Sequence, residues 1–169
     1  MKKFLLILLV SFICVNSVMA FGSRKNAREI AEQIPELKNI SCKFTQKKIQ
    51  EDLVLNSGGN FKFISDKGVV FETLYPIKMI TTYNSPRNKH INDIILAVSK
   101  KDYTYLDKNF DLDFTKLDER WQLVLNPKKD VIKQHLHSVV IDGNSGIDRI
   151  YIDTVNSGQT EILFDCEKE

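Results

Sequence analysis

Short runs of alternating apolar and polar residues, separated by turn residues, constrain this fold more than any other feature of the sequence. The clearest of these runs lie between residues 44 and 81. Around the run Asn60–Phe63, for example, Phe61 and Phe63 fall on one face of an extended chain, and Asn60 and Lys62 fall on the other. Repeated runs of this kind predict an antiparallel meander with one apolar face. That face needs an apolar cover, and what covers it decides the function.

Strand-length segments continue along most of the chain. The predicted strands are Ile40–Ile49, Leu53–Leu55, Asn60–Ile64, Val69–Leu74, Ile77–Tyr83, the alternating residues 110–114 and 121–125, Ile132–Ile141, Ile147–Val155 and Thr160–Cys166. Gly58-Gly59 is interpreted as a turn pair, and Asp142–Gly146 is typical of a hairpin turn. The sequence therefore predicts about nine or ten strands, enough to curl toward a barrel or a half-barrel.

Helical periodicity occurs at two places. Behind Ser23 as N-cap, Ala27, Ile30, Ala31 and Ile34 form one apolar stripe that ends near Pro35. The second stripe consists of Ile91, Ile94, Ile95 and Val98, and Asp102 could cap a further short turn of helix. One-sided helices of this kind could pack on the concave side of the sheet as a lid.

The order of these pieces resembles the LolA-like family of periplasmic lipoprotein carriers. The resemblance rests on a series of residues in a fixed order: Phe44 and Gln46 after a helix, then Gly59, Phe61 and Phe63, then Phe71 before Pro76. The resemblance is to the ordered series, because no single motif is specific. It implies a mostly β fold with an α lid: an open, unclosed antiparallel half-barrel whose N-terminal and central helices cover the concave face.

One family feature is missing from this sequence. Typical members carry an arginine at the end of the Gly-initiated aromatic strand, where this chain has Ser65-Asp66. The segment after Trp121 is also compact. Both departures suggest a divergent member, whose cargo could be a lipid or a glycolipid instead of a lipoprotein.

The first twenty residues have the pattern of a secretion signal. Lys2 and Lys3 precede an apolar run, and Val18-Met19-Ala20 offers a small-residue cleavage site. An uncleaved anchor is the alternative. The expected domains are the signal at 1–20 and one LolA-like carrier domain at 21–169, in the periplasm. Without Lys2 and Lys3 the 24 basic residues become 22 and match the 22 acidic ones, so no nucleic-acid partner is indicated.

Two cysteines, Cys42 and Cys166, remain after the signal segment. In an exported protein an even number of cysteines permits a disulfide, and two buried free thiols are the alternative. If strands containing these residues are neighbours, the bond would tie the two ends of the domain together.

Residues for catalysis or metal binding are poorly supported by the sequence. His135 and His137 stand two residues apart, as two metal ligands on one strand face would, but a polar strand face is the simpler interpretation. No nucleophile motif or phosphate loop occurs. The sequence therefore predicts no enzyme, no cofactor and no metal.

The apolar inward-facing residues are the remaining candidates. From spacing alone they are ordinary core, whereas the resemblance implies that some of them line a cavity for acyl chains. The candidate cavity residues are Phe61, Phe63, Phe71, Met79, Trp121, Leu123, Ile30, Ile94, Ile95 and Val98. The resulting hypothesis is a monomeric carrier that takes acyl chains from an inner-membrane donor to an outer-membrane acceptor. An exported interaction module with a filled core is the alternative.

Overall fold

The computed structural model describes residues 29, 32–34, 39–65, 67–82, 89–156 and 158–166, with the backbone alone at 89, 90 and 117. The predicted signal at 1–20, the N-cap Ser23 and the candidate Ile30 lie outside the described residues. So do most residues of the predicted N-terminal helix, of which Glu29, Glu32 and Gln33 are described and helical.

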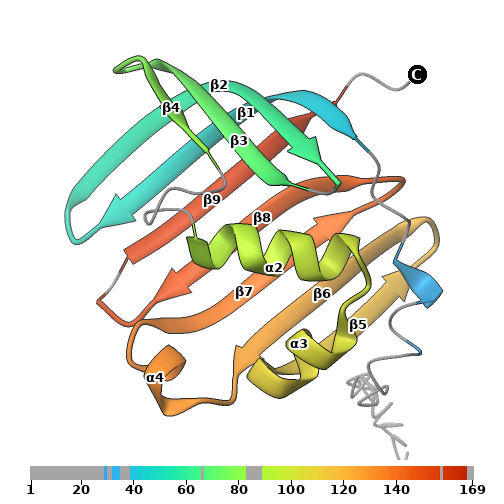
Figure 1. The fold of residues 1–169 in the computed structure, drawn as a ribbon. Coiled ribbons are helices and arrows are strands. Elements are labelled where there is room, and N and C mark those ends of the chain that lie inside the picture. The colour runs from blue at the N-terminus through green and yellow to red at the C-terminus, as the bar shows by residue number, and fades with distance from the viewer. Residues whose placement is uncertain are drawn as a thin grey trace, which may run out of the picture.

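Within the described part of the chain, nine strands form one antiparallel sheet (Figure 1). They are β1 (Ile40–Gln50), β2 (Leu53–Ile64), β3 (Gly68–Tyr75), β4 (Met79–Thr81), β5 (Phe110–Leu117), β6 (Arg120–Pro127), β7 (Leu136–Gly143), β8 (Ile147–Thr154) and β9 (Gly158–Asp165). Their order in the sheet is β4-β3-β2-β1-β9-β8-β7-β6-β5. The first and last strands of the meander, β1 and β9, therefore meet in the middle, and β4 and β5 are the open edges.

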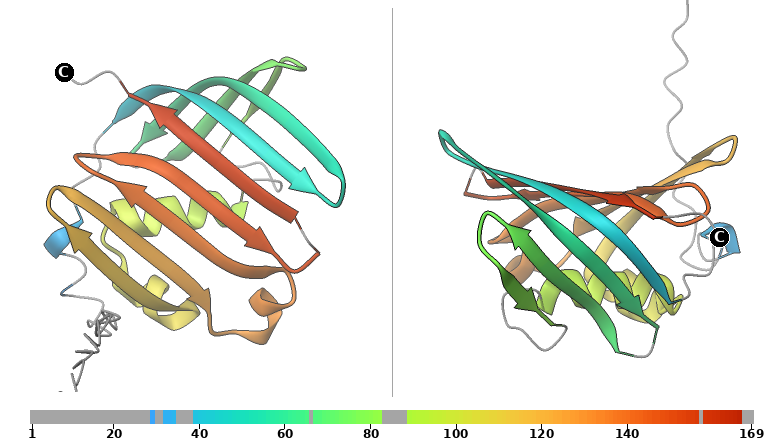
Figure 2. Two further views of the ribbon diagram at one scale, coloured as in Figure 1. Left: turned by 180° about the vertical axis from the view of Figure 1, so that it is seen from behind. Right: turned by 90° about the horizontal axis from the view of Figure 1, so that it is seen from above.

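The sheet is strongly curved and does not close, because the edges β4 and β5 do not pair with each other. Figure 2 shows β1 to β4 bending round toward the side on which the helices lie. This arrangement confirms the predicted fold class, an open half-barrel with helices on its concave side.

Three short helices are described besides the N-terminal residues. α2 (Lys89–Ser99) crosses the concave face, α3 (Tyr103–Asn109) follows it, and α4 (Asp130–Lys133) joins β6 to β7 (Figure 1). As predicted, Asp102 caps α3: its Oδ1 accepts a hydrogen bond of 3.0 Å from the Tyr105 amide.

The core lies between the concave face and the helices. Alternate residues of the strands supply one side of it, such as Phe61 and Phe63 on β2 and Leu123 and Leu125 on β6. Burial of these side chains is the main stabilising term of the fold, at roughly 25 cal/mol for each Å² of apolar surface removed from water.

The predicted turn at Gly58-Gly59 is wrong. These glycines lie inside β2, which runs unbroken from Leu53 to Ile64, and the turn is at Glu51-Asp52 instead. A Cβ on Gly59 would collide with the backbone carbonyl oxygen of Glu72, at a β-bulge between β2 and β3. The glycine pair thus serves a close approach of two backbones in the curved sheet, not a reversal of the chain.

The predicted strand Ile132–Ile141 is wrong in its first part. Residues 130–133 form α4, and the strand begins only at Leu136. His135 consequently lies in the turn before β7, while His137 is exposed on β7, so the two histidines do not share a strand face. The strand predicted at Ile77–Tyr83 is reduced to Met79–Thr81 among the described residues.

Candidate functional site

The candidate site is the apolar space between α2 and the concave face of the sheet. The apolar stripe of α2 faces this space: Ile94, Ile95 and Val98 are 5%, 1% and 1% exposed. Because the helix repeats every 3.6 residues, these positions lie on one side of it, toward the sheet. Two small cavities remain where helix and strands do not pack completely.

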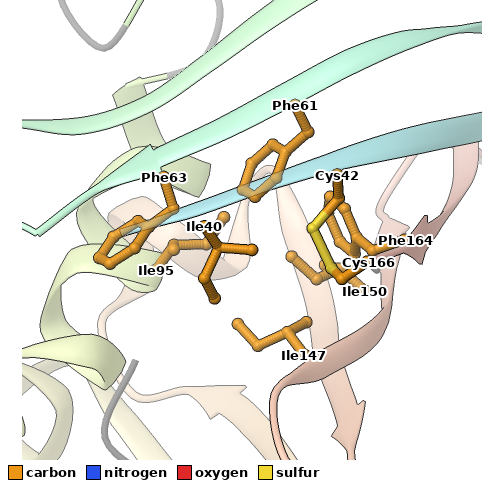
Figure 3. Close-up of a pocket in the computed structure, with 9 residues that line it drawn as sticks. All are labelled: Ile40, Cys42, Phe61, Phe63, Ile95, Ile147, Ile150, Phe164 and Cys166. Atoms are coloured by element: carbon orange, nitrogen blue, oxygen red, sulfur yellow. A yellow bond between two sulfur atoms is a disulfide. The ribbon is translucent and has the colours of Figure 1, made fainter. Parts of the chain in front are cut away.

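The first cavity has a volume of about 20 Å³ and lies between α2 and the β2-β1-β9-β8 region (Figure 3). In the close-up, Phe63 and Ile40 lie toward Ile95 of α2, and the Cys42–Cys166 disulfide closes the opposite side. The side chains that line the cavity are Ile40, Cys42, Phe61, Phe63, Ile95, Ile147, Ile150, Phe164 and Cys166.

The second cavity, of about 60 Å³, lies under the first half of α2. It is lined by Ile91, Ile94, Ile95, Leu136, Val139, Ile141, Ile150 and Ile152. Ile95 and Ile150 border both cavities, so the two spaces are neighbours on either side of this pair. All the lining residues of both cavities are apolar or disulfide-bonded.

The cavities are small for an acyl chain. A cavity needs about 10–15 Å³ to hold one water molecule, so the first cavity has room for one water and the second for a few. In this conformation the interior is nearly filled by side chains. A long apolar ligand would need α2 to move away from the sheet.

The structure brings together some of the sequence-predicted site residues. Phe61, Phe63 and Ile95 line the first cavity, and Ile94 and Ile95 line the second. Five further candidates line neither cavity. Phe71, Leu123 and Val98 are buried elsewhere in the core, and Trp121 is buried with its indole N–H donating to the Asn144 carbonyl. Met79 is 43% exposed on β4.

Aromatic rings and a disulfide hold the first cavity's wall together. Phe61 lies 5.0 Å from Phe71 and 4.6 Å from Phe164, measured between ring centroids, and Phe44 packs edge-on against Phe71 at 5.1 Å. Cys42 and Cys166 form the disulfide that the sequence permits, with their Cα atoms 4.3 Å apart. This wall is therefore cross-linked, in contrast to α2, which faces it.

Sequence reasoning missed Asn92, a buried polar residue on α2. Its Oδ1 accepts a hydrogen bond of 2.9 Å from the Val69 amide at the start of β3. This bond ties the helix to the start of β3. The only sequence signal was an asparagine beside the apolar stripe, and its partner 23 residues away could not be inferred.

Tyr103 on α3 carries a buried hydroxyl. Within the described part of the chain, this hydroxyl has no hydrogen-bond partner. Desolvation of the phenol raises the pKa of Tyr103 from 10.0 to about 12. The pKa of Tyr105 is also raised, first by desolvation and then by the charges of Asp93 and Asp102.

The convex face carries a shallow groove whose lining includes charged residues from β7, β8 and β9. Arg149 Nε donates to Asp142 at 2.6 Å, and Arg149 Nη1 donates to Glu161 at 3.3 Å. The hydrogen bond to Asp142 is the main cause of the raised pKa of Arg149. Two carboxylates thus share one guanidinium, and these three side chains form a cross-strand ion-pair network with a net negative charge.

Two kinds of functional feature are absent from the described residues. No group of three or more His, Cys, Asp or Glu side chains there is arranged to hold a metal ion. None of the helices described is both long enough and apolar enough to cross a membrane.

No protein-family model and no curated protein matches this sequence. Among solved structures, the fold is similar to the crystal structure of a LolA superfamily protein from Nitrosomonas europaea. The identity is 7% and the TM-score 0.43, over 86% of this chain and 94% of that chain. At this TM-score the likeness carries no argument about family, cargo or mechanism.

Proposed function

We propose that this protein is a non-enzymatic carrier, which holds the acyl chains of lipids or lipoproteins between α2 and the concave face of the sheet. The observation that carries the proposal is the pair of neighbouring apolar cavities directly beneath a single helix. Ile95 and Ile150 separate these cavities, so a movement of α2 that withdraws Ile95 would join them into one apolar space.

The energetics suit reversible binding. Each methylene group moved from water into such a space contributes about 0.8 kcal/mol. Part of this gain offsets the cost of lifting the apolar face of α2 from the sheet and breaking the Asn92–Val69 hydrogen bond. A carrier of this kind holds its cargo moderately and releases it to an acceptor that binds it better, since transfer follows the difference in affinity.

The setting of the proposal comes from the sequence. The signal-like pattern at 1–20 supports export to the periplasm, and the ordered resemblance to the LolA-like series supports lipoprotein or lipid cargo. An inner-membrane donor and an outer-membrane acceptor would then be the partners of a monomeric carrier. The Cys42–Cys166 disulfide suits an oxidising compartment.

A second candidate is an interaction module that carries no cargo. The nearly filled interior favours it, because the cavities of about 20 and 60 Å³ hold no acyl chain in this conformation. The two candidates differ in whether α2 opens, and an experiment on cargo separates them.

The test is native mass spectrometry with lipid extraction, on protein purified from cells without detergent. The carrier predicts co-purifying acyl-chain mass, or uptake of an added apolar dye. Ile95→Phe should reduce uptake because the larger ring fills space that both cavities border, whereas Ile95→Val at the same position should not reduce it. Circular dichroism would check that both variants fold.

Absence of both lipid mass and dye uptake in the parent protein would reject the carrier in favour of the interaction module. Equal uptake by Ile95→Phe and the parent would place any cargo site elsewhere.

A further inference from the structure

The two ends of the sheet differ in the residues that they expose. The turns β1–β2 and β3–β4, the turn β8–β9 and the α4 connection all lie at one end, as the antiparallel order requires (Figures 1 and 2). Eleven large hydrophobic side chains are exposed among the described residues, and only Leu163 lies away from this end. We call this end of the sheet the apolar end. Its ten exposed hydrophobic residues are Leu53, Val54, Leu55, Leu74, Tyr75, Ile77, Met79, Ile80, Val131 and Val155.

The opposite end is polar. Its described turn residues include Ser65 and Lys67 in β2–β3, Asp118 and Glu119 in β5–β6, and Asn144 in β7–β8. An even scatter of exposed hydrophobic residues would be ordinary for a small domain, but their concentration at one end is not.

The apolar end extends across the sheet. The β3–β4 turn lies beside β2, because Tyr75 pairs with Gly58. The β1–β2 turn lies beside the β8–β9 turn, because Gln50 pairs with Gly158. Further along, the Val155 amide bonds to the His135 carbonyl just after α4. The exposed apolar residues therefore form a rim along four successive connections, in which the β1–β2 hairpin reaches five residues beyond the level of Tyr75.

Lysines flank the apolar tips. Lys78 stands between Ile77 and Met79, Lys48 pairs across from Leu55, and Lys129 precedes α4, which contains Val131. In the described part of the chain, none of these three lysines makes an ion pair.

Acidic residues are unevenly distributed along the rim. Glu51 and Asp52 form the tip of the β1–β2 turn, and Asp130 begins α4. The β3–β4 turn from Leu74 to Ile80 contains a lysine and no acidic residue. It also holds the most exposed apolar side chains, Ile77 at 76% and Ile80 at 67%.

We propose that the apolar end docks on the surface of a lipid bilayer that contains anionic phospholipids, with the β3–β4 turn as the main contact. Aliphatic tips beside lysines fit the boundary between acyl chains and anionic headgroups. Because the tips stand on separate turns, a deformable surface can bury them together, whereas a rigid protein partner would need a matching recess for each. This inference does not depend on cargo, although the second cavity lies toward the same end, lined by Leu136 and Ile152.

The test is flotation of the protein, as isolated from cells, with vesicles. One set is phosphatidylcholine alone, and the other is equal parts phosphatidylcholine and phosphatidylglycerol. We expect binding to the anionic vesicles that weakens as salt is raised, because exposed lysines are screened. The affinity of the double variant Ile77→Ser/Ile80→Ser for the anionic vesicles should fall by at least about tenfold, since two exposed aliphatic side chains no longer insert.

Leu163→Ser is the matched control, because Leu163 is an aliphatic residue 46% exposed away from the apolar end. It should bind as the parent does. Hydrogen exchange with vesicles present should protect residues 74–81 and leave 118–119 and 143–146 unchanged, because only the apolar end contacts the bilayer.

Three results would overturn the proposal: no binding of the parent to anionic vesicles, an equal loss in Leu163→Ser, or protection at the polar end only. A parent dimer that the Ile77→Ser/Ile80→Ser variant converts to monomer would assign the surface to a second copy instead. Cargo mass in the double variant reports separately on the carrier, since neither isoleucine lines a cavity.

Discussion

At the scale of single residues, the interior combines almost complete apolar packing with a few buried polar groups. Asn92 has a partner on the sheet, and Ser99 bonds to the Leu96 carbonyl of its own helix. The Tyr103 hydroxyl differs, because it is buried without a partner in the described part of the chain. A buried donor without a partner costs about 1–3 kcal/mol, so this hydroxyl weakens the fold.

Removing that hydroxyl should stabilise the protein. We expect Tyr103→Phe to raise the free energy of unfolding at neutral pH by about 1 kcal/mol, because the ring is kept and the unpaired group is lost. Urea unfolding followed by circular dichroism measures the change. A loss of stability would show that the hydroxyl has a partner, such as a bound water.

The same residue makes stability depend on alkaline pH. The pKa of Tyr103 is raised to about 12 in the folded protein, from 10.0. The unfolded chain therefore ionises first, so the free energy of unfolding does not depend on this group below pH 10 and falls as the pH rises from 10 toward 12. Tyr103→Phe should decline less steeply over that window, with the remaining loss coming partly from Tyr105, whose pKa is also raised.

At the scale of the elements, α2 is the part best suited to move. The part of the sheet that lines the first cavity is held together by a disulfide and by packed aromatic rings. The helix is held to the sheet by apolar contacts and the Asn92–Val69 hydrogen bond. In the proposed carrier, movement of α2 would therefore break a specific hydrogen bond, which a substitution can remove beforehand.

Asn92→Ala should loosen the lid. It leaves the Val69 amide without its acceptor and should lower the free energy of unfolding by about 1–3 kcal/mol. It should also speed uptake of an apolar dye. Ser99→Ala is the matched control, because Ser99 is equally buried on α2 but bonds only within the helix. Faster uptake in both variants would mean that general destabilisation, not the bond to the sheet, controls the lid.

The elements also show what sequence periodicity can and cannot predict. Alternation located most strands, and the 3.6-residue stripe located α2, because both patterns follow directly from burial of one face. The turn predicted at Gly58-Gly59 was wrong because a glycine pair is the local sequence signal both for a turn and for a close approach of two backbones. The strand start predicted at Ile132 was wrong because Val131 and Ile132 fit one turn of helix as well as an extended run.

Prediction of the site was partial for a different reason. Phe61, Phe63, Ile94 and Ile95 could be assigned to the interior from their own periodicity. Ile40, Ile147, Ile150 and Phe164 complete the first cavity, but this follows only from the sheet order that places β1, β9 and β8 side by side. That order depends on pairing between residues more than a hundred positions apart, which local patterns do not encode.

At the scale of the whole molecule, the sheet has two halves that meet at β1 and β9. β4-β3-β2-β1 comes from the first part of the described chain and β9-β8-β7-β6-β5 from the second. The register of that junction runs from Lys43 opposite Asp165 to Gln50 opposite Gly158. The Cys42–Cys166 disulfide lies just beyond one end of this register, so it closes the junction at the end opposite the apolar rim.

Breaking this bond should destabilise the entire fold. The bond closes a loop of 124 residues, which contributes about 5 kcal/mol in the chain-entropy description of the unfolded state. Cys42→Ala/Cys166→Ala should therefore lower the midpoint of urea unfolding by about 2 M, for a domain of this size. Alanine is preferred to serine because Cys42 is 6% exposed, and a buried hydroxyl would add its own cost.

Parent protein treated with a thiol reductant is the control, and it should unfold at the midpoint of the double variant. Agreement of the two would assign the loss to the bond, since reduction keeps both sulfur atoms in the wall of the first cavity. An unchanged midpoint in both would mean that β1–β9 pairing alone holds the halves together. Because the bond constrains mainly the unfolded chain, the folded variant should keep its β-sheet spectrum, and only its resistance to urea should fall.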